Sequence, residues 1–181
     1  FLTTTTICSH VIKAQEQNME LLDTILQRKA RLIDYECINE NGERGGKRLI
    51  AFGRFAGMAG MVDTLRGLGE RLLAKGFSTP FLSMGSTYMY ANLDLVKRAV
   101  TELGAEIQSR KIPDGIAPMT FVFTGTGNVS QGALEIFKLL PHEMVKVSDL
   151  PSVVANGRND ILYGCIATVF FGAVFFNRGE G

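Results

Sequence analysis

The segment MTFVFTGTGNVSQGA, residues 119–133, has the order of residue types that a strand, a tight turn and a helix require. An apolar run at 121–123 leads into Gly125 and Gly127, and a helix-forming run at 132–140 follows. In a dinucleotide-binding unit, the first glycine permits the tight turn. The second lets the backbone approach a pyrophosphate at the helix N-terminus. The segment therefore indicates a site for a nicotinamide cofactor.

The third glycine of that pattern is replaced by Ser130, with Gly132 two residues further on. This position governs the close packing of helix on strand, and serine is small enough to serve. We expect Asn128 and Val129 to line the cofactor site as well. The alternative is an ordinary strand-to-helix turn, in which the glycines only bend and cap the chain.

The end of the second strand is where such units distinguish NAD from NADP. An acidic residue about 20 positions after the glycines selects NAD. Here the expected strand, 143–147, ends in Lys146-Val147-Ser148. A cation followed by a hydroxyl suits a 2′-phosphate, so the sequence favours NADP. Asp149, one residue later, keeps NAD as the alternative.

Two further sets of residues could carry chemistry upstream of this turn. His10 ends the strand TTTTICS and precedes a helix with Lys13, and such a histidine can act as a general acid or base near neutral pH. A histidine that only hydrogen-bonds at the junction is the alternative. Glu36 shares a strand face with Asp34, and Arg48 opens the partner strand. This arginine either holds a substrate carboxylate or forms a cross-strand ion pair with Glu36.

The elements that must position these residues alternate between helical and strand periodicity, which indicates an α/β fold. Helical spacing is found at 11–27, 57–75 and 93–107, and strand patterns are found at 32–38 and 48–52, joined by a turn. Pro113-Asp114-Gly115 and Pro118 then interrupt the chain before the nucleotide strand. We expect a first α/β piece, residues 1–113, and the start of a nucleotide-binding domain, residues 114–181.

The composition excludes several function classes. A net charge of +1 over 181 residues gives no surface for nucleic acid. Three separated cysteines support neither a metal site nor a disulfide framework, and a reducing, cytoplasmic setting follows. The apolar run at 161–176 is shorter than the roughly 20 residues that span a bilayer, so we expect a buried strand pair there instead of a membrane anchor.

Several long blocks carry a resemblance to a known family. They are CSHVIKAQEQNMELLD, RLIDYE, KRLIAFGRFAGMAGMVDTLRGLG, STPFLSMGSTYMY and FVFTGTGNVSQGALEIFKLLPHE. Together they resemble the lysine–ketoglutarate reductase portion of the bifunctional aminoadipic semialdehyde synthases, most closely the plant form. The wider group is the alanine dehydrogenase/transhydrogenase and saccharopine dehydrogenase superfamily. This resemblance implies three-layer, Rossmann-like α/β domains: part of a substrate domain followed by the start of a nucleotide-binding domain.

The resemblance implies condensation of L-lysine with 2-oxoglutarate and reduction by NADPH to saccharopine. It assigns His10 as the acid/base and Lys13 as a neighbouring cation. Glu36 would tune the charge of the site, and Arg48 would orient a substrate carboxylate. In the full-length relatives a saccharopine dehydrogenase domain is covalently linked.

The chain also departs from the family pattern. A catalytic lysine expected upstream has no counterpart, and the sequence diverges after about residue 168. We therefore expect this chain alone to be inactive or poorly folded. The alternatives are an amino-acid dehydrogenase of the alanine dehydrogenase type and a truncated product without catalysis.

Overall fold

The computed structural model describes residues 6–9, 16–42 and 46–167. The chain separates into two compact units, Phe1–Phe52 and Gly53–Gly181, each described here by itself. His10 and Lys13 lie outside the described residues.

Unit 1 is built around two short parallel strands. Its elements are β1 (Thr6–Ser9), η1 (Glu16–Asn18), α1 (Met19–Gln27), β2 (Arg31–Asp34) and η2 (Tyr35–Cys37). β1 pairs with β2 in parallel, from Thr6 opposite Arg31 to Ser9 opposite Asp34. The TTTTICS strand is therefore confirmed over its described residues. α1 confirms the C-terminal part of the helix predicted over 11–27.

Two strand predictions in unit 1 are wrong in extent. The strand expected over 32–38 ends at Asp34, whose carboxylate accepts a 2.9 Å hydrogen bond from the Glu36 N–H and so caps η2. Glu36 therefore lies in a helical turn and does not share a strand face with Asp34. The expected return strand at 48–52 is reduced to one antiparallel bridge, Asn39 with Arg48.

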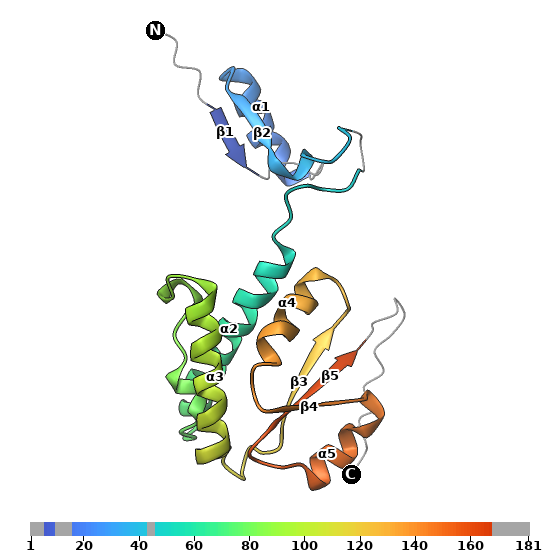
Figure 1. The fold of residues 1–181 in the computed structure, drawn as a ribbon. Helices are drawn as coiled ribbons and strands as arrows, with labels where there is room; N and C mark the ends of the chain where they lie inside the picture. Colours follow the sequence, from blue (N-terminus) through green and yellow to red (C-terminus); the bar gives the residue numbers. More distant parts are fainter. Residues whose placement is uncertain (1–5, 10–15, 43–45, 168–181) are drawn as a thin grey trace. The chain divides into compact units, whose positions relative to one another are not determined.

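Unit 2 combines four α-helices and three short 3₁₀ turns with a small sheet among the described residues. Its longer helices are α2 (Gly53–Leu73), α3 (Leu93–Arg110), α4 (Asn128–Phe137) and α5 (Leu150–Asn156), and its strands are β3 (Met119–Thr124), β4 (His142–Val145) and β5 (Leu162–Ala167). Short 3₁₀ turns are η3 (Pro80–Ser83), η4 (Thr87–Met89) and η5 (Val147–Asp149). Figure 1 shows α2, α3 and α4 gathered beside the sheet.

The three strands of unit 2 are all parallel, in the order β3-β5-β4. The prediction of an α/β fold is confirmed, and the parallel sheet is compatible with a Rossmann-like domain. The third strand lies between the first two, however, whereas strands that follow one another in a Rossmann half lie side by side. β5 covers the first described part of the apolar run at 161–176, as a largely buried strand. The strand pair expected around Gly172 lies outside the described residues.

The core of unit 2 follows the helical stripes read from the sequence. Met58, Met61, Val62, Leu65 and Leu72 are buried along α2, and they match its predicted apolar face. Phe121 and Phe123 of β3 place their rings 5.4 and 5.2 Å from the ring of Phe137 on α4. This aromatic cluster fixes α4 against the sheet.

The boundary between the units falls before α2, so α2 and α3 belong to the same hydrophobic core as the three-stranded sheet of unit 2. The division into domains expected at residue 113 stays a prediction. Within the described part of the chain, no helix is both long enough and apolar enough to cross a bilayer.

Candidate functional site

The glycine turn lies at the carboxyl end of β3, where it connects directly to α4. Gly125 has a φ of +80°, a conformation that favours glycine. Its N–H donates a 3.0 Å hydrogen bond to the Ala167 carbonyl of β5, so the sheet ladder continues into the turn. The Gln131 side chain donates to the Thr126 carbonyl at 3.0 Å and closes the turn on its other side. The strand–turn–helix order predicted from the sequence is confirmed.

Gly127 is the N-cap of α4, and its extended backbone leaves the helix end open. Glycine has no side chain with which to cap the helix, and the described residues show no side-chain capping hydrogen bond at this position. A Cβ built at Gly127 meets no atom within 4 Å, so the position that a side chain would occupy beside the first turn of α4 is open among the described residues. Asn128 and Val129 are exposed beside it. Helix N-terminal N–H groups that face open space suit an anionic group, so these residues fit the diphosphate of a dinucleotide.

Ser130 was expected to pack α4 closely against its strand, and the structure shows where the tight packing of α4 lies. Ser130 is buried, and its Oγ has no hydrogen-bond partner among the described residues. The closest packing falls on Gly132, where a Cβ would lie 1.9 Å from the Arg54 carbonyl oxygen of α2. α4 therefore packs tightly on a helix at this point. The feature of the sequence that indicated this tight helix contact was Gly132, two positions after Ser130.

Lys146 lies at the same edge of the sheet as the glycine turn, because the carboxyl ends of parallel strands share an edge. It follows β4 and is exposed. β5 separates β4 from β3, so the backbones of these strands are roughly 10 Å apart, two inter-strand spacings. The contact that we expect between Lys146 and a 2′-phosphate must span that separation, and it stays a prediction.

In unit 1, the predicted pair of Glu36 and Arg48 is brought together. The Arg48 guanidinium lies 3.4 Å from the Glu36 carboxylate. The Arg48 side chain is 34% exposed and that of Glu36 is 21% exposed. The Arg48 Nε is buried without a hydrogen-bond partner among the described residues. This guanidinium thus keeps an unused donor beside its ion pair.

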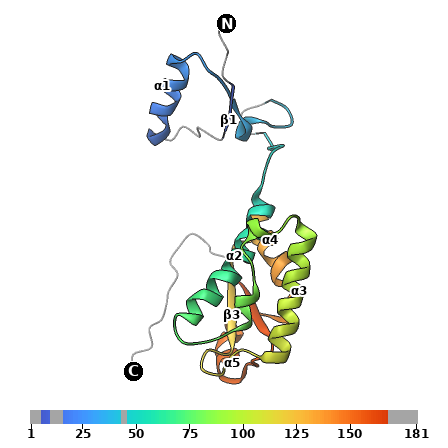
Figure 2. The same cartoon turned by 90° about the vertical axis from the view of Figure 1, so that its left-hand side faces the viewer.

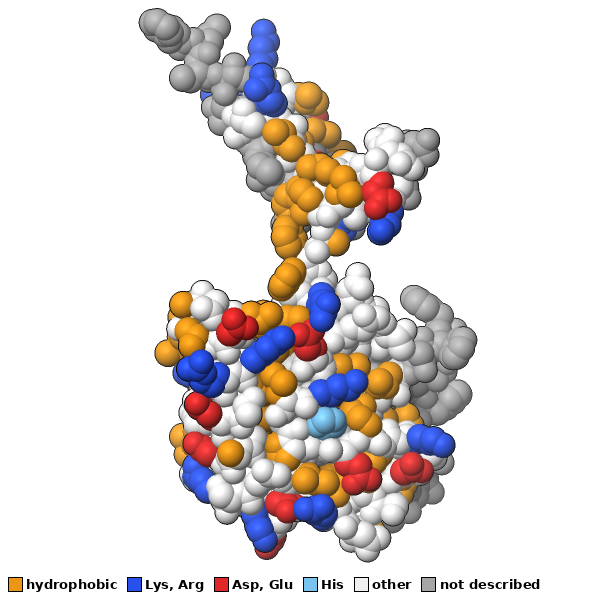
Figure 3. All heavy atoms as spheres, in the orientation of Figure 1, with side chains coloured by type: hydrophobic (Ala, Val, Ile, Leu, Met, Phe, Trp, Pro, Cys, Tyr) orange, Lys and Arg blue, Asp and Glu red, His pale blue; other side chains and the backbone are white. Residues whose placement is uncertain are grey.

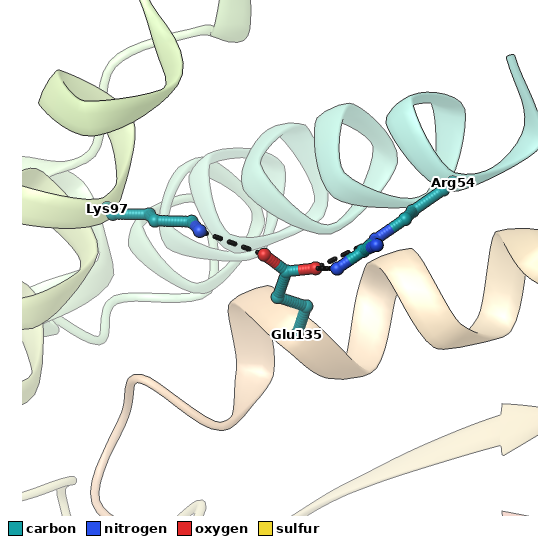
Figure 4. A network of polar contacts seen from close by, with 3 residues as sticks. All are labelled: Arg54, Lys97 and Glu135. Atoms are coloured by element: carbon teal, nitrogen blue, oxygen red, sulfur yellow. Dashed lines mark hydrogen bonds and ion pairs between the residues drawn. The ribbon is translucent and has the colours of Figure 1, made fainter.

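An ion network joins side chains of α2, α3 and α4 (Figure 4). Its residues were not predicted from the sequence. Glu135 of α4 receives hydrogen bonds from Lys97 of α3, at 2.8 Å, and from two guanidinium nitrogens of Arg54 of α2. The Lys97 ammonium, and after it the Arg54 guanidinium, holds the pKa of the Glu135 carboxyl below its usual value. The network connects α2, α3 and α4.

The second histidine of the sequence lies at the start of a strand. His142 is the first residue of β4, its Nδ1 lies 2.8 Å from the Leu140 carbonyl oxygen, and its ring lies edge-on to Phe137. It is half-buried and plays a packing role.

The parallel α/β sheet, and the open glycine turn before a helix, define a class of protein compatible with Rossmann-like nucleotide binding. Comparison with curated proteins then identifies its relatives. The chain is 53% identical to the alpha-aminoadipic semialdehyde synthase of Arabidopsis thaliana, with 88% of this chain aligned. It is 49% identical to the mitochondrial alpha-aminoadipic semialdehyde synthase of Bos taurus and 48% identical to that of Rattus norvegicus, with 87% aligned in each case.

The chain is thus homologous to one segment of the alpha-aminoadipic semialdehyde synthases, and the resemblance in its sequence blocks is confirmed. It spans 16% of the length of the plant protein and 17% of the length of the mammalian ones. No family model matches the chain.

Proposed function

We propose that this chain forms part of a lysine-catabolic oxidoreductase that condenses L-lysine with 2-oxoglutarate and reduces the adduct to saccharopine with NADPH. The observation that carries the proposal is the open turn before α4. Gly127 leaves space at a helix N-terminus, within the segment shared with the aminoadipic semialdehyde synthases. The name of the relatives supports a role in lysine degradation. The open glycine turn supports the binding of a nicotinamide cofactor.

The turn from Gly125 to Ser130 would hold the diphosphate of NADPH through helix N–H groups, and Lys146 would contribute positive charge on the same sheet edge. The chemistry that a bound NADPH would supply there is a hydride for the substrate carbon. Arg48 binds a substrate carboxylate through the exposed part of its guanidinium, while Glu36 balances its charge at 3.4 Å. His10, three positions before Lys13 in the sequence, gives and takes the protons of the condensation.

Binding of NADPH to the 181-residue chain is the direct test. Nicotinamide fluorescence is expected to change on titration with the wild-type chain. It is expected to stay constant with Gly127→Asp, because a carboxylate there occupies the diphosphate position and repels its charge. A parallel titration with NADH measures the preference between the two cofactors. Equal binding by the Gly127→Asp chain would refute a role for this turn.

Gly67→Asp is the matched control for that variant. Gly67 lies on α2, and a Cβ there also meets no atom within 4 Å, so the same charge is added without a clash. This variant is expected to bind NADPH like the wild-type chain. We expect no turnover of lysine with 2-oxoglutarate from this chain, because it spans only 16% of the length of the plant relative. Turnover of pyruvate with ammonia would indicate the alanine dehydrogenase type instead.

A further inference from the structure

The first turn of α2 lies directly against the residues that open α4. A Cβ added at Gly53 would lie 3.2 Å from the Asn128 Cβ and 3.6 Å from the Val129 Cγ2. One turn further along, a Cβ at Gly57 would lie 1.9 Å from the Val129 carbonyl oxygen. The beginning of α2 therefore contacts the same residues that face the open end of α4. Both views of the fold show the two helices side by side (Figures 1 and 2).

Two further contacts join α2 to α4, and a third ties α4 to α3. The Gly132 Cα faces the Arg54 carbonyl oxygen so closely that a Cβ has no room. The Arg54 guanidinium holds Glu135, one turn further along α4, and Lys97 holds Glu135 from α3. A shift of the first turn of α2 must therefore displace Asn128 and Val129.

We propose that Gly53 is a positioning residue for the cofactor turn: by lacking a side chain, it sets where the N–H groups of Asn128 and Val129 point. This inference rests on the proposed function, since it assumes that those N–H groups face the cofactor diphosphate. Gly53 itself would touch no cofactor atom, and it acts through its contact with Asn128.

The contact distances separate Gly53 from the other glycines of the α2–α4 contact. At Gly57 and Gly132 an added methyl group would overlap backbone atoms at 1.9 Å, so the fold itself must change. At Gly53 the added methyl group would meet side-chain carbon at 3.2 Å, which requires a shift of only a few tenths of an ångström. A shift of that size preserves the core and still moves a hydrogen-bond donor.

The test compares Gly53→Ala with Gly60→Ala in the full 181-residue chain. Gly60 lies on the same helix, and a Cβ there meets no atom within 4 Å. We expect Gly53→Ala to raise the NADPH Kd about fivefold, and Gly60→Ala to leave it within about twofold of wild type. Melting temperatures of both variants should equal or exceed that of the wild type. An unchanged Kd for Gly53→Ala would overturn the proposal.

A second variant separates positioning from a general effect on stability. Asn128→Gly removes the Cβ that the new methyl group would meet. The pair Gly53→Ala/Asn128→Gly should therefore bind NADPH about as well as Asn128→Gly alone. A double-mutant cycle of the four chains measures this coupling directly. Additive effects of the two substitutions would contradict a route through Asn128.

Hydrogen exchange decides the inference even if NADPH does not bind. Failure of the wild-type chain to bind NADPH would refute the proposed function. In that case the amides of 127–130 should still exchange at altered rates in Gly53→Ala and at wild-type rates in Gly60→Ala. Identical exchange in both variants would refute the positioning role by itself.

Discussion

Gly125 and Gly127 serve the same turn for different physical reasons. Gly125 is required by its own backbone, because a φ of +80° costs a residue with a side chain roughly 1–2 kcal/mol. Gly127 has an ordinary extended backbone, so its role depends only on the space in front of it. A pattern of two glycines does not distinguish these roles, and the backbone angles do.

Glu135 is a single residue that makes the free energy of unfolding depend on pH. Its carboxyl pKa is lowered from the ordinary 4.5, mainly by the hydrogen bond from Lys97 and then by that from Arg54. A lowered folded-state pKa contributes stability above the ordinary value, and this contribution is lost as pH falls through the lowered value. Glu135→Gln should therefore cost about 1 kcal/mol of unfolding free energy at pH 7, a modest figure because the pair is partly solvated.

The difference between wild type and Glu135→Gln should shrink below pH 4.5 and vanish in stronger acid. Urea denaturation at pH 7, 5 and 3 measures it. Glu102→Gln on the exposed face of α3 is the control for charge alone, and it should change stability little at any of these pH values. A constant difference for Glu135→Gln across the three pH values would contradict the ionic origin.

At the scale of elements, the α2–α4 contact depends on glycines that face backbone. Gly132→Ala places a methyl group 1.9 Å from the Arg54 carbonyl oxygen, and the helices must separate to admit it. We expect a loss of about 3 kcal/mol or more in unfolding free energy, at the upper end of overpacking effects. Guanidinium denaturation checks this value.

Gly67→Ala supplies the contrast for that substitution. Gly67 is exposed on α2 with open space around its Cα, so alanine should stabilise the helix by about 0.5–1 kcal/mol. Opposite signs for the two glycine-to-alanine changes would establish that space, and not helix propensity, determines the effect. Equal effects would argue against the tight contact.

The elements with strong periodicity were predictable from the sequence, and the exceptions have physical causes. The stripe of α2 and the strand–turn–helix around Gly125 follow from spacing, because burial imposes it. The early end of β2 was not predictable from alternation, since the Asp34 carboxylate competes for the next backbone N–H. The place of β5 between β3 and β4 depends on contacts distant in sequence, which local patterns do not encode.

At the scale of the molecule, the two units differ in how much apolar surface they bury. Unit 2 has a continuous core from α2 to β5. In the described part of unit 1, Ile25 alone is buried among the hydrophobic residues. The large apolar side chains that unit 1 leaves exposed are Leu21, Leu26, Ile33, Leu49 and Phe52. Hydrophobic side chains are also visible between charged ones on the face of unit 2 in Figure 3.

This contrast predicts that unit 2 carries the cooperative stability of the chain. A two-stranded sheet with so little buried surface is marginal in water, whereas the core cluster of unit 2 is built from residues of unit 2. A chain of residues 53–181 should therefore melt within about 3 °C of the 181-residue chain, measured by circular dichroism. Unit 1 carries Glu36 and Arg48, so its marginal stability also accounts for the inactivity expected of the 181-residue chain. A melting temperature for 53–181 lower by 10 °C or more, roughly 2–5 kcal/mol for a chain of this size, would show that unit 1 stabilises unit 2.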